Sequence, residues 1–245
     1  MALTVRSQRE LDKALKDTAN KDTVIEIHFG TIKRPAKIKH TTQCIVVKDY
    51  CALCMSNTVV RAVDNAHIIA KDNSNIVATD DATVDAYDMS SVTALGNTKI
   101  CIKGFNNQLS LFNNSVGIVT GFCSQINAHD STVAIIKNKQ QLGDIVINAY
   151  QNAVVINNTG AATATVNAYH NSTIVGQNNC NITTYGDACA IAAKNASIKA
   201  LDSSFGIVKR GCKGTASFGC AIAASRQSDI DSRSPNIAFT DDLPF

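Results

Sequence analysis

The fold is decided by residues 62–96, which read AVDNAHII AKDNSNIV ATDDATVD AYDMSSVT ALG when written in rows of eight. Alanine heads every row, aspartate or glycine holds the third place, a small residue the fifth, and Val or Ile the seventh. A fixed period of this kind marks a repeat architecture. The alanines that head the rows are Ala62, Ala70, Ala78, Ala86 and Ala94.

The repeat predicts short β-strands. Eight is an even number, so the side chains that alternate along a strand keep the same phase from unit to unit. The small residue, the Val or Ile and the alanine then point into a core. The residues between them, such as His67, Thr83 and Asp85, are mostly polar and are expected to face water. The Asp-Asn pairs between strands are typical of turns, because both residue types tolerate left-handed backbone angles.

The repeat extends along most of the chain. It fades from about Phe105 to Gly160, where the phase slips. It returns with Val166, Ile174 and Ile182, eight residues apart. The inward small position then continues as Ser172, Cys180, Ala188, Ala196, Ser204, Cys212 and Cys220.

These observations predict an all-β chain that forms a parallel β-helix, or β-solenoid, of eight-residue units. Val or Ile in mid-strand and Ala or Ser toward the corners suit a triangular cross-section. We therefore expect three strands per rung, about 24 residues long, and about seven rungs stacked at ~4.8 Å. A flat coil of about 16 residues with two strands per rung is the alternative.

The two ends of the chain depart from the repeat. Ser7 followed by Glu10 is a capping box, which predicts a helix from Gln8 to about Asp17. A strand is expected over 24–29. We expect residues 1–50 to form a small α/β cap, 51–225 the solenoid, and 226–245 a C-terminal cap or a tail that reaches a partner.

Composition excludes several classes of function. The net charge of +3 is too small for the clustered basic face of a nucleic-acid-binding protein. No apolar run approaches the 18 residues or so of a membrane span, and the first ten residues lack the apolar core of a secretory signal. A cytoplasmic location is therefore expected.

The nine cysteines are an odd number and suggest reduced thiols. Cys180, Cys212 and Cys220 replace Ala or Ser at the inward position, so they are interpreted as core residues. Cys51 and Cys54 form a CxxC without a second pair, which makes zinc a weak alternative to burial. The four ligands would be His40, Cys44, Cys51 and Cys54. No cofactor is expected.

Few residues remain for chemistry once the repeat is accounted for. The aspartates are explained as corner residues, and no nucleophile motif accompanies a histidine. We therefore expect no enzymatic activity. The residues left as candidate contact anchors are the outward tyrosines and the last residue, although solvated corner residues are the favoured interpretation of the tyrosines. They are Tyr87, Tyr150, Tyr169, Tyr185 and Phe245.

Units such as 80–87, DDATVDAY, resemble those of octad-repeat solenoid proteins of bacteria and bacteriophages. The resemblance covers Val60 to about Ala224, and Arg6 to Leu11 resembles the short helical start of those proteins. Most such proteins have no assigned activity, so the resemblance implies the fold and suggests a phage origin.

We expect a scaffold that binds another protein, such as a phage-encoded inhibitor of a host defence system. The alternatives are a virion or surface attachment component and a carbohydrate-active enzyme. No membrane partner is expected, and a homo-oligomer stays open.

Overall fold

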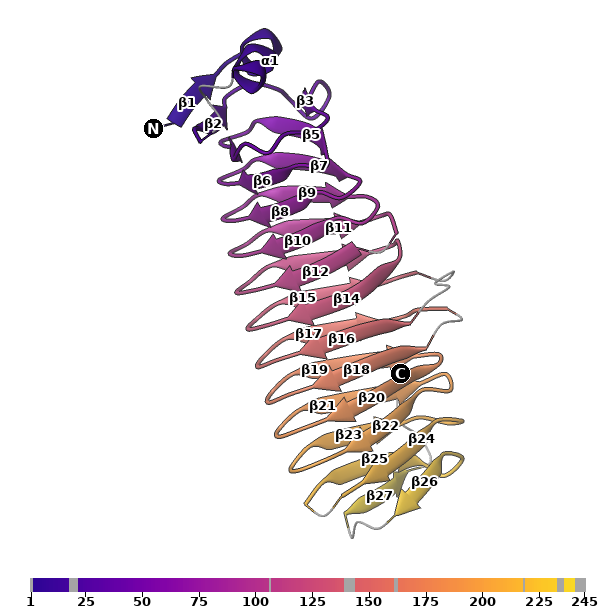
Figure 1. The fold of residues 1–245 in the computed structure, drawn as a ribbon. Coiled ribbons are helices and arrows are strands. Elements are labelled where there is room, and N and C mark those ends of the chain that lie inside the picture. Colours follow the sequence, from indigo (N-terminus) through magenta and orange to yellow (C-terminus); the bar gives the residue numbers. More distant parts are fainter. Residues whose placement is uncertain are drawn as a thin grey trace. The chain divides into compact units, whose positions relative to one another are not determined.

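The computed structural model describes residues 2–17, 22–105, 107–138, 144–160, 163–217, 219–232 and 236–240. The chain divides into an N-terminal unit (Met1–Gly117) and a C-terminal unit (Ile118–Phe245), each described by itself below. In each unit, short parallel strands stack in two sheets, and the chain alternates between them (Figure 1). This is the predicted parallel β-solenoid, with about 13 turns in the two units together.

The N-terminal unit has two sheets, which we call even and odd after the strand numbers, with β1 as the one odd-numbered strand of the even sheet. Its even sheet contains, in order, β1 (Ala2–Val5), β2 (Val24–Ile27), β4 (Ile45–Val47), β6 (Val59–Ala62), β8 (Asn75–Ala78), β10 (Ser91–Ala94) and β12 (Asn107–Leu111). Its odd sheet contains β3 (Ala36–Ile38), β5 (Ala52–Ser56), β7 (His67–Lys71), β9 (Thr83–Ala86) and β11 (Lys99–Ile102). Strand β13 (Val116–Val119) spans the boundary between the units.

The C-terminal unit is built in the same way. Its even sheet contains β14 (Cys123–Ala128), β16 (Ile145–Ala149), β18 (Ala164–Ala168), β20 (Cys180–Thr184), β22 (Ser197–Ala200), β24 (Lys213–Ala216) and β26 (Asp229–Ser232). Its odd sheet contains β15 (Val133–Ile136), β17 (Val154–Asn157), β19 (Thr173–Gln177), β21 (Cys189–Ala193), β23 (Phe205–Val208), β25 (Ala221–Ser225) and β27 (Ile237–Thr240).

The expectation of three strands per rung is wrong. Val60 of β6 lies beside Ile76 of β8, sixteen residues later, and Ile68 of β7 lies beside Val84 of β9 at the same spacing. Each rung therefore holds two strands and two corners. The sizes of the core residues fit a flattened coil as well as a triangle, so side-chain volume could not choose between them.

The corners reverse the chain sharply, which flattens the coil. The aspartates Asp64, Asp72 and Asp80 have φ angles of 55°, 53° and 61°. These are the left-handed angles predicted for corner residues. The amide of Ala66 donates to the carbonyl of Val63 at 3.2 Å, which closes a four-residue turn between an even strand and the next odd strand.

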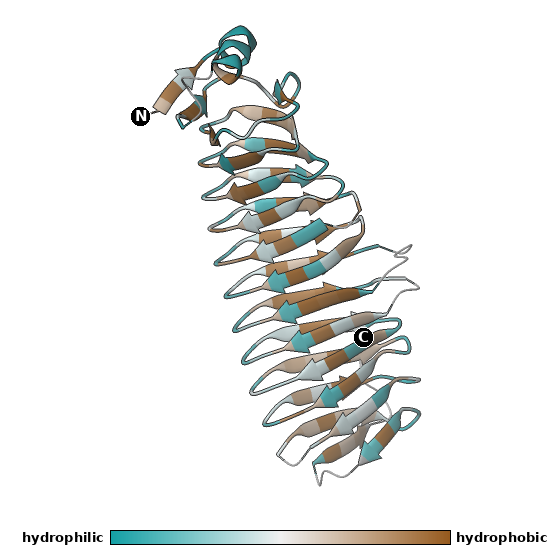
Figure 2. Ribbon diagram, in the orientation of Figure 1, coloured by the Kyte–Doolittle hydropathy of each residue, from teal (hydrophilic) through white to brown (hydrophobic). Residues whose placement is uncertain are grey.

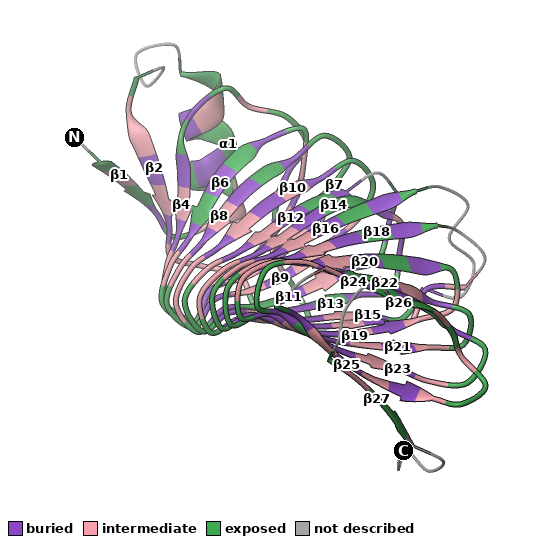
Figure 3. Cartoon of the chain, turned by 90° about the horizontal axis from the view of Figure 1, so that it is seen from below, coloured by how far each residue is buried: buried purple, intermediate pink, exposed green. Residues whose placement is uncertain are grey.

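The core lies between the two sheets. Buried residues alternate with exposed or half-buried ones along most strands (Figure 3). Apolar and polar residues alternate similarly along many of the strands (Figure 2). Ala, Val and Ile fill the narrow space, and Cys180, Cys212 and Cys220 are fully buried there as predicted.

The phase slip in the middle of the sequence corresponds to longer rungs. Gln125 pairs with Val146 after 21 residues and Ile145 with Ala164 after 19, before the spacing returns to 16 between Ala164 and Cys180. The extra residues lie in the corners that follow β15 and β17. These connections span 137–144 and 158–163, whereas only 72–74 connect β7 to β8.

The helix α1 (Gln8–Lys16) begins where the capping box predicted, because the Ser7 side chain accepts a hydrogen bond from the amide of Glu10 at 3.3 Å. The predicted strand after it is β2. The parallel pairing of strands begins before residue 51, because β4 pairs with β6. It continues past residue 225, because β25 pairs with β27. Among the described residues, no helix has the length and hydropathy of a membrane span.

Candidate functional site

Three of the candidate tyrosines come together in the C-terminal unit. The rings of Tyr150, Tyr169 and Tyr185 stack with centroids 4.9 Å apart and planes within 7°, and His129 stacks on Tyr150 at 4.4 Å. Each residue follows the last residue of an even strand, so consecutive rungs place the rings one above another. We call His129, Tyr150, Tyr169 and Tyr185 the aromatic ladder.

A row of asparagines runs beside the aromatic ladder. The Nδ2 group of Asn148 donates to Oδ1 of Asn127 at 3.0 Å, and Nδ2 of Asn167 donates to Oδ1 of Asn148 at 3.0 Å. These outward residues stand two positions before the ring in each rung. The triplets Asn127-Ala128-His129, Asn148-Ala149-Tyr150 and Asn167-Ala168-Tyr169 show the pattern in the sequence, and aligning them across the phase slip would have added His129 to the candidates.

The ladder is rigid and presents ring edges. Both faces of Tyr150 and Tyr169 are covered by neighbouring rings, and all four side chains are half-buried. Stacked aromatic pairs contribute about 0.5–1.5 kcal/mol each beyond their burial. Burial raises the pKa of Tyr169, and the neighbouring Tyr150 and Tyr185 raise it further. A sugar ring needs a free aromatic face, so this arrangement suits a protein contact better than a glycan.

The other two candidate contact residues, Tyr87 and Phe245, are not part of the aromatic ladder. Tyr87 follows an odd strand, β9, where the ammonium group of Lys103 stands 5.6 Å from the ring centroid. With two strands per rung, alternate units of eight residues belong to opposite sheets, so Tyr87 follows an odd strand whereas every ladder residue follows an even one. Phe245 lies outside the described residues.

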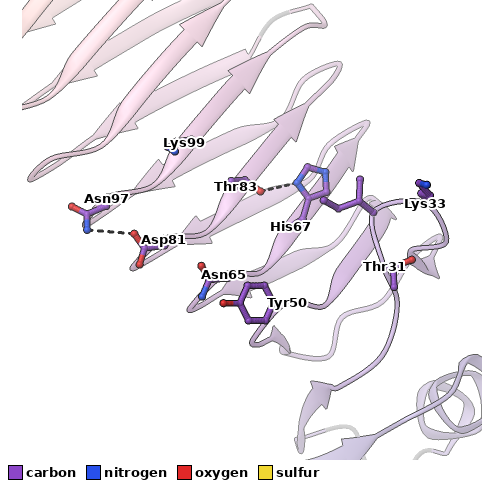
Figure 4. Close-up of a pocket in the computed structure, with 10 residues that line it drawn as sticks. Thr31, Lys33, Tyr50, Asn65, His67, Asp81, Thr83, Asn97 and Lys99 are labelled. Carbon is purple, nitrogen blue, oxygen red and sulfur yellow. Dashed lines mark hydrogen bonds between the residues drawn. The ribbon is translucent and has the colours of Figure 1, made fainter.

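The N-terminal unit has a hollow of about 810 Å³ on the outer side of its odd sheet. Its wall comes from β7, β9 and β11 and from the corners before them (Figure 4). Tyr50, which is 80% exposed, and the segment around Ile32 complete the lining. The lining residues are Thr31, Ile32, Lys33, Tyr50, Asn65, His67, Asp81, Thr83, Asn97 and Lys99.

A polar network connects the wall of this hollow to the strands beside it. His67 Nδ1 lies 2.7 Å from Thr83 Oγ1 (Figure 4). The Nζ atom of Lys103 lies 2.8 Å from Oδ1 of Asp85. Burial lowers the pKa of His67, while the carboxylate of Asp85 acts in the opposite direction. Hydrogen bonding to Asp85 raises the pKa of Lys103.

Thr83, His67 and Asp85 resemble the hydroxyl, imidazole and carboxylate of a nucleophilic relay. Such a relay needs hydrogen bonds at both ring nitrogens. Here His67 Nε2 stands 3.9 Å from Asp85 Oδ2, beyond hydrogen-bond distance, and Lys103 engages the other oxygen of Asp85. The three side chains therefore do not have the geometry of a catalytic relay.

The zinc alternative receives no support from the geometry. Within the described ranges, no group of three or more His, Cys, Asp or Glu residues could hold a metal ion. His40 Nδ1 lies 3.1 Å from the carbonyl oxygen of Asn57. No disulfide joins any of the nine cysteines, all of which lie in the described part of the chain. Burial raises the pKa of Cys180 to about 11 and that of Cys123 to about 12.

Comparisons of the chain with protein-family models, with curated proteins and with solved structures found no match.

Proposed function

We propose that this chain is a non-enzymatic scaffold that binds another protein through the aromatic ladder and the asparagine row beside it. The observation that carries the proposal is the stack of Tyr150, Tyr169 and Tyr185, which fixes three tyrosine edges in one line. Tyrosine is enriched at interface positions that dominate binding energy. Stacked rings are already ordered, so binding costs little side-chain entropy.

The surface beside the ladder suits a polar partner. The amides of Asn127, Asn148 and Asn167 offer both donors and acceptors, and the outward residues next to them, Thr165 and Asn181, are uncharged. Such a surface forms directional hydrogen bonds without the cost of burying a charge. Together the two rows form a rigid strip that a folded protein surface can contact.

The origin and location of the partner are proposed from the repeat. Its resemblance to octad-repeat solenoids common in bacteriophage genomes makes a cytoplasmic protein of a bacterial host, such as a component of a defence system, the partner that we propose. The alternative is a role as a structural component of a virion, in which the ladder would contact another virion protein.

The test compares tyrosines inside and outside the ladder. The full-length chain is immobilised and exposed to lysate of the host bacterium, and captured proteins are identified and titrated by calorimetry. We expect a stoichiometric partner that the Tyr150→Ala, Tyr169→Ala, Tyr185→Ala variant fails to bind. The matched control is Tyr50→Ala with Tyr87→Ala, which removes the other two tyrosines.

A second variant separates binding from folding. Replacing the three ladder tyrosines by Phe keeps the ring stack but removes the hydroxyl groups, so we expect weaker binding at an unchanged melting temperature. The proposal is wrong if the alanine variant retains the partner, if no stoichiometric partner is captured, or if the chain cleaves a glycan substrate.

A further inference from the structure

The outer face of the odd sheet in the C-terminal unit is apolar, contrary to the expectation that outward residues are polar. Two columns of outward side chains run across β15, β17, β19, β21, β23 and β25, and all are half-buried or exposed. One column contains Val133, Val154, Thr173, Cys189, Phe205 and Ala221. The other contains Ile135, Ile156, Val175, Ile191, Ile207 and Ala223. We call these twelve residues the apolar face.

The repeat does not require this composition. Equivalent outward positions of the odd sheet in the N-terminal unit include the polar residues His67, Asp85 and Lys99 beside the apolar Ile69 and Cys101. On the even sheet of the C-terminal unit, the outward positions include Asn148 and Asn181. The core is complete without the apolar face, since its inward partners are already buried. A contiguous apolar patch that stays half-buried or exposed among the described residues is typical of a contact surface for another protein.

The dimensions of the apolar face suit a dimer. Six strands at ~4.8 Å and four residues at ~3.3 Å give a face of about 29 Å by about 13 Å, or on the order of 400 Å² per copy. Two such faces bury on the order of 800 Å² and, with the corners beside them, approach the lower end of specific interfaces at about 1,200 Å². An interface of this size is typical of weak, reversible association.

The regular spacing favours a second copy over an unrelated protein. Within this unit the strands stay in register from rung to rung, so the outward side chains form ridges at the strand spacing. A second copy has ridges at the same spacing, so two such sheets packed face to face stay in contact over their whole length. A twisted sheet of a globular protein would meet only a few of these rungs. No charged residue occurs in the apolar face, so two identical faces do not repel.

The corners beside the apolar face carry opposite charges. Asp187 lies in the turn before β21 and Lys194 directly after that strand; Asp202 and Lys209 flank β23 in the same way. Asp130 and Lys137 repeat the pattern at β15. One edge of the face is therefore acidic and the other basic.

We propose that two copies of this chain associate through the apolar face, about a two-fold axis parallel to the direction in which the strands of the C-terminal unit stack. In this arrangement, the strands of the two copies run antiparallel across the interface. The acidic edge of each copy then lies over the basic edge of the other, with Asp187 opposite Lys194. A two-fold axis along the strands would instead bring like charges together. The dimer is independent of the ladder contact proposed above.

The first test measures mass. Sedimentation equilibrium of the full-length chain in reducing buffer should show a concentration-dependent dimer. Ile191→Asp, which would bury two unpaired carboxylates per dimer, should weaken association at least about tenfold. The matched control is Val146→Asp, an exposed valine on the even sheet, which should leave association unchanged. Circular dichroism confirms that both variants fold.

The second test examines the orientation. Asp187→Lys alone and Lys194→Asp alone should each weaken the dimer about threefold to tenfold, and the double swap should restore it.

A monomer at all concentrations would overturn the proposal, as would a dimer insensitive to Ile191→Asp. If a captured partner rather than a second copy is lost with Ile191→Asp, the face binds another protein and the dimer proposal is wrong. If both single swaps strengthen the dimer, the axis is wrong. The ladder variants change none of the twelve residues of the apolar face, so the two proposals fail separately.

Discussion

At the scale of single residues, the space around each glycine determines which substitutions the narrow core and the corners accept. A Cβ atom on Gly104 would lie 1.9 Å from the backbone nitrogen of Asp88, so Gly104→Ala must move the backbone of the adjacent rung. A Cβ atom on Gly206 would meet its nearest atoms, on Ile198 and Ile222, at 3.4 Å.

We expect Gly104→Ala to lower the free energy of unfolding by about 2 kcal/mol or more. Gly206→Ala should raise it by about 0.4–1 kcal/mol, because alanine restricts the unfolded chain more than glycine does. Urea denaturation of both variants checks the pair. Equal destabilisation by the two substitutions would contradict the geometry.

Ser172 and Ser204 occupy the same inward small position two rungs apart, but only the hydroxyl of Ser204 has a hydrogen-bond partner. The hydroxyl of Ser172 is buried with no hydrogen-bond partner, whereas Ser204 Oγ accepts from Thr184 Oγ1 at 2.8 Å. Burying an unpaired hydroxyl costs about 1–3 kcal/mol. We therefore expect Ser172→Ala to stabilise the chain by about 0.5–1 kcal/mol and Ser204→Ala to destabilise it by about 1 kcal/mol. Opposite shifts of the denaturation midpoint test this, and shifts of the same sign would refute it.

Residue roles that depend on local chemistry could be predicted from the sequence. The left-handed corner aspartates and the buried Cys180, Cys212 and Cys220 follow from their position in the repeat. The aromatic ladder could not be assembled in the same way. Whether Tyr150 meets Tyr169 depends on a rung of 19 residues, and that length comes from corner connections rather than from the repeat.

At the scale of elements, two sheets with the same repeat have acquired different outer surfaces. The alternation that fixes the inward face of each strand is set by its backbone, so the core was predictable. The outward face has no such constraint, and extending the polar pattern around His67 and Thr83 to the whole chain missed the apolar face. The number of strands per rung was also wrong, because the period does not report how sharply a corner turns.

The polar face of the N-terminal unit should make stability depend on pH through His67. Burial holds its pKa below the unfolded value, so the folded state binds the proton less readily than the unfolded state. The contribution of neutral His67 is complete above the unfolded pKa of about 6.5 and is lost as the pH falls below it.

We expect the free energy of unfolding of the wild type to fall between pH 7 and pH 5, with a shallower fall in His67→Asn. Part of the slope should remain, since burial also lowers the pKa of His129. Denaturation at a series of pH values measures both slopes. Identical slopes in the two proteins would show that His67 does not titrate in this way.

At the scale of the whole molecule, a stack of parallel strands has open edges that invite further strands. The N-terminal cap covers the edge of the odd sheet. Strand β3 is the last strand of the odd sheet, and Lys37 directs its backbone groups away from β5. The side chain of Gln8 in α1 takes both: its Oε1 accepts from the Lys37 amide at 2.9 Å, and its Nε2 donates to the Lys37 carbonyl at 3.0 Å. One side-chain amide thus forms the two backbone hydrogen bonds that a further strand would form.

Gln8→Ala should expose this edge. A hydrogen bond contributes about 0.5–1.5 kcal/mol net, so exchange of the Lys37 amide hydrogen should accelerate about threefold to tenfold. Gln8→Glu keeps the acceptor and loses the donor, so it should retain most of the protection of that amide. Hydrogen–deuterium exchange of a peptide covering β3 measures the effect, and light scattering should show more aggregation for the alanine variant. If exchange is unchanged in Gln8→Ala, the helix covers the stack by packing Leu11 and Ala14 alone, and the amide pair does not protect the edge.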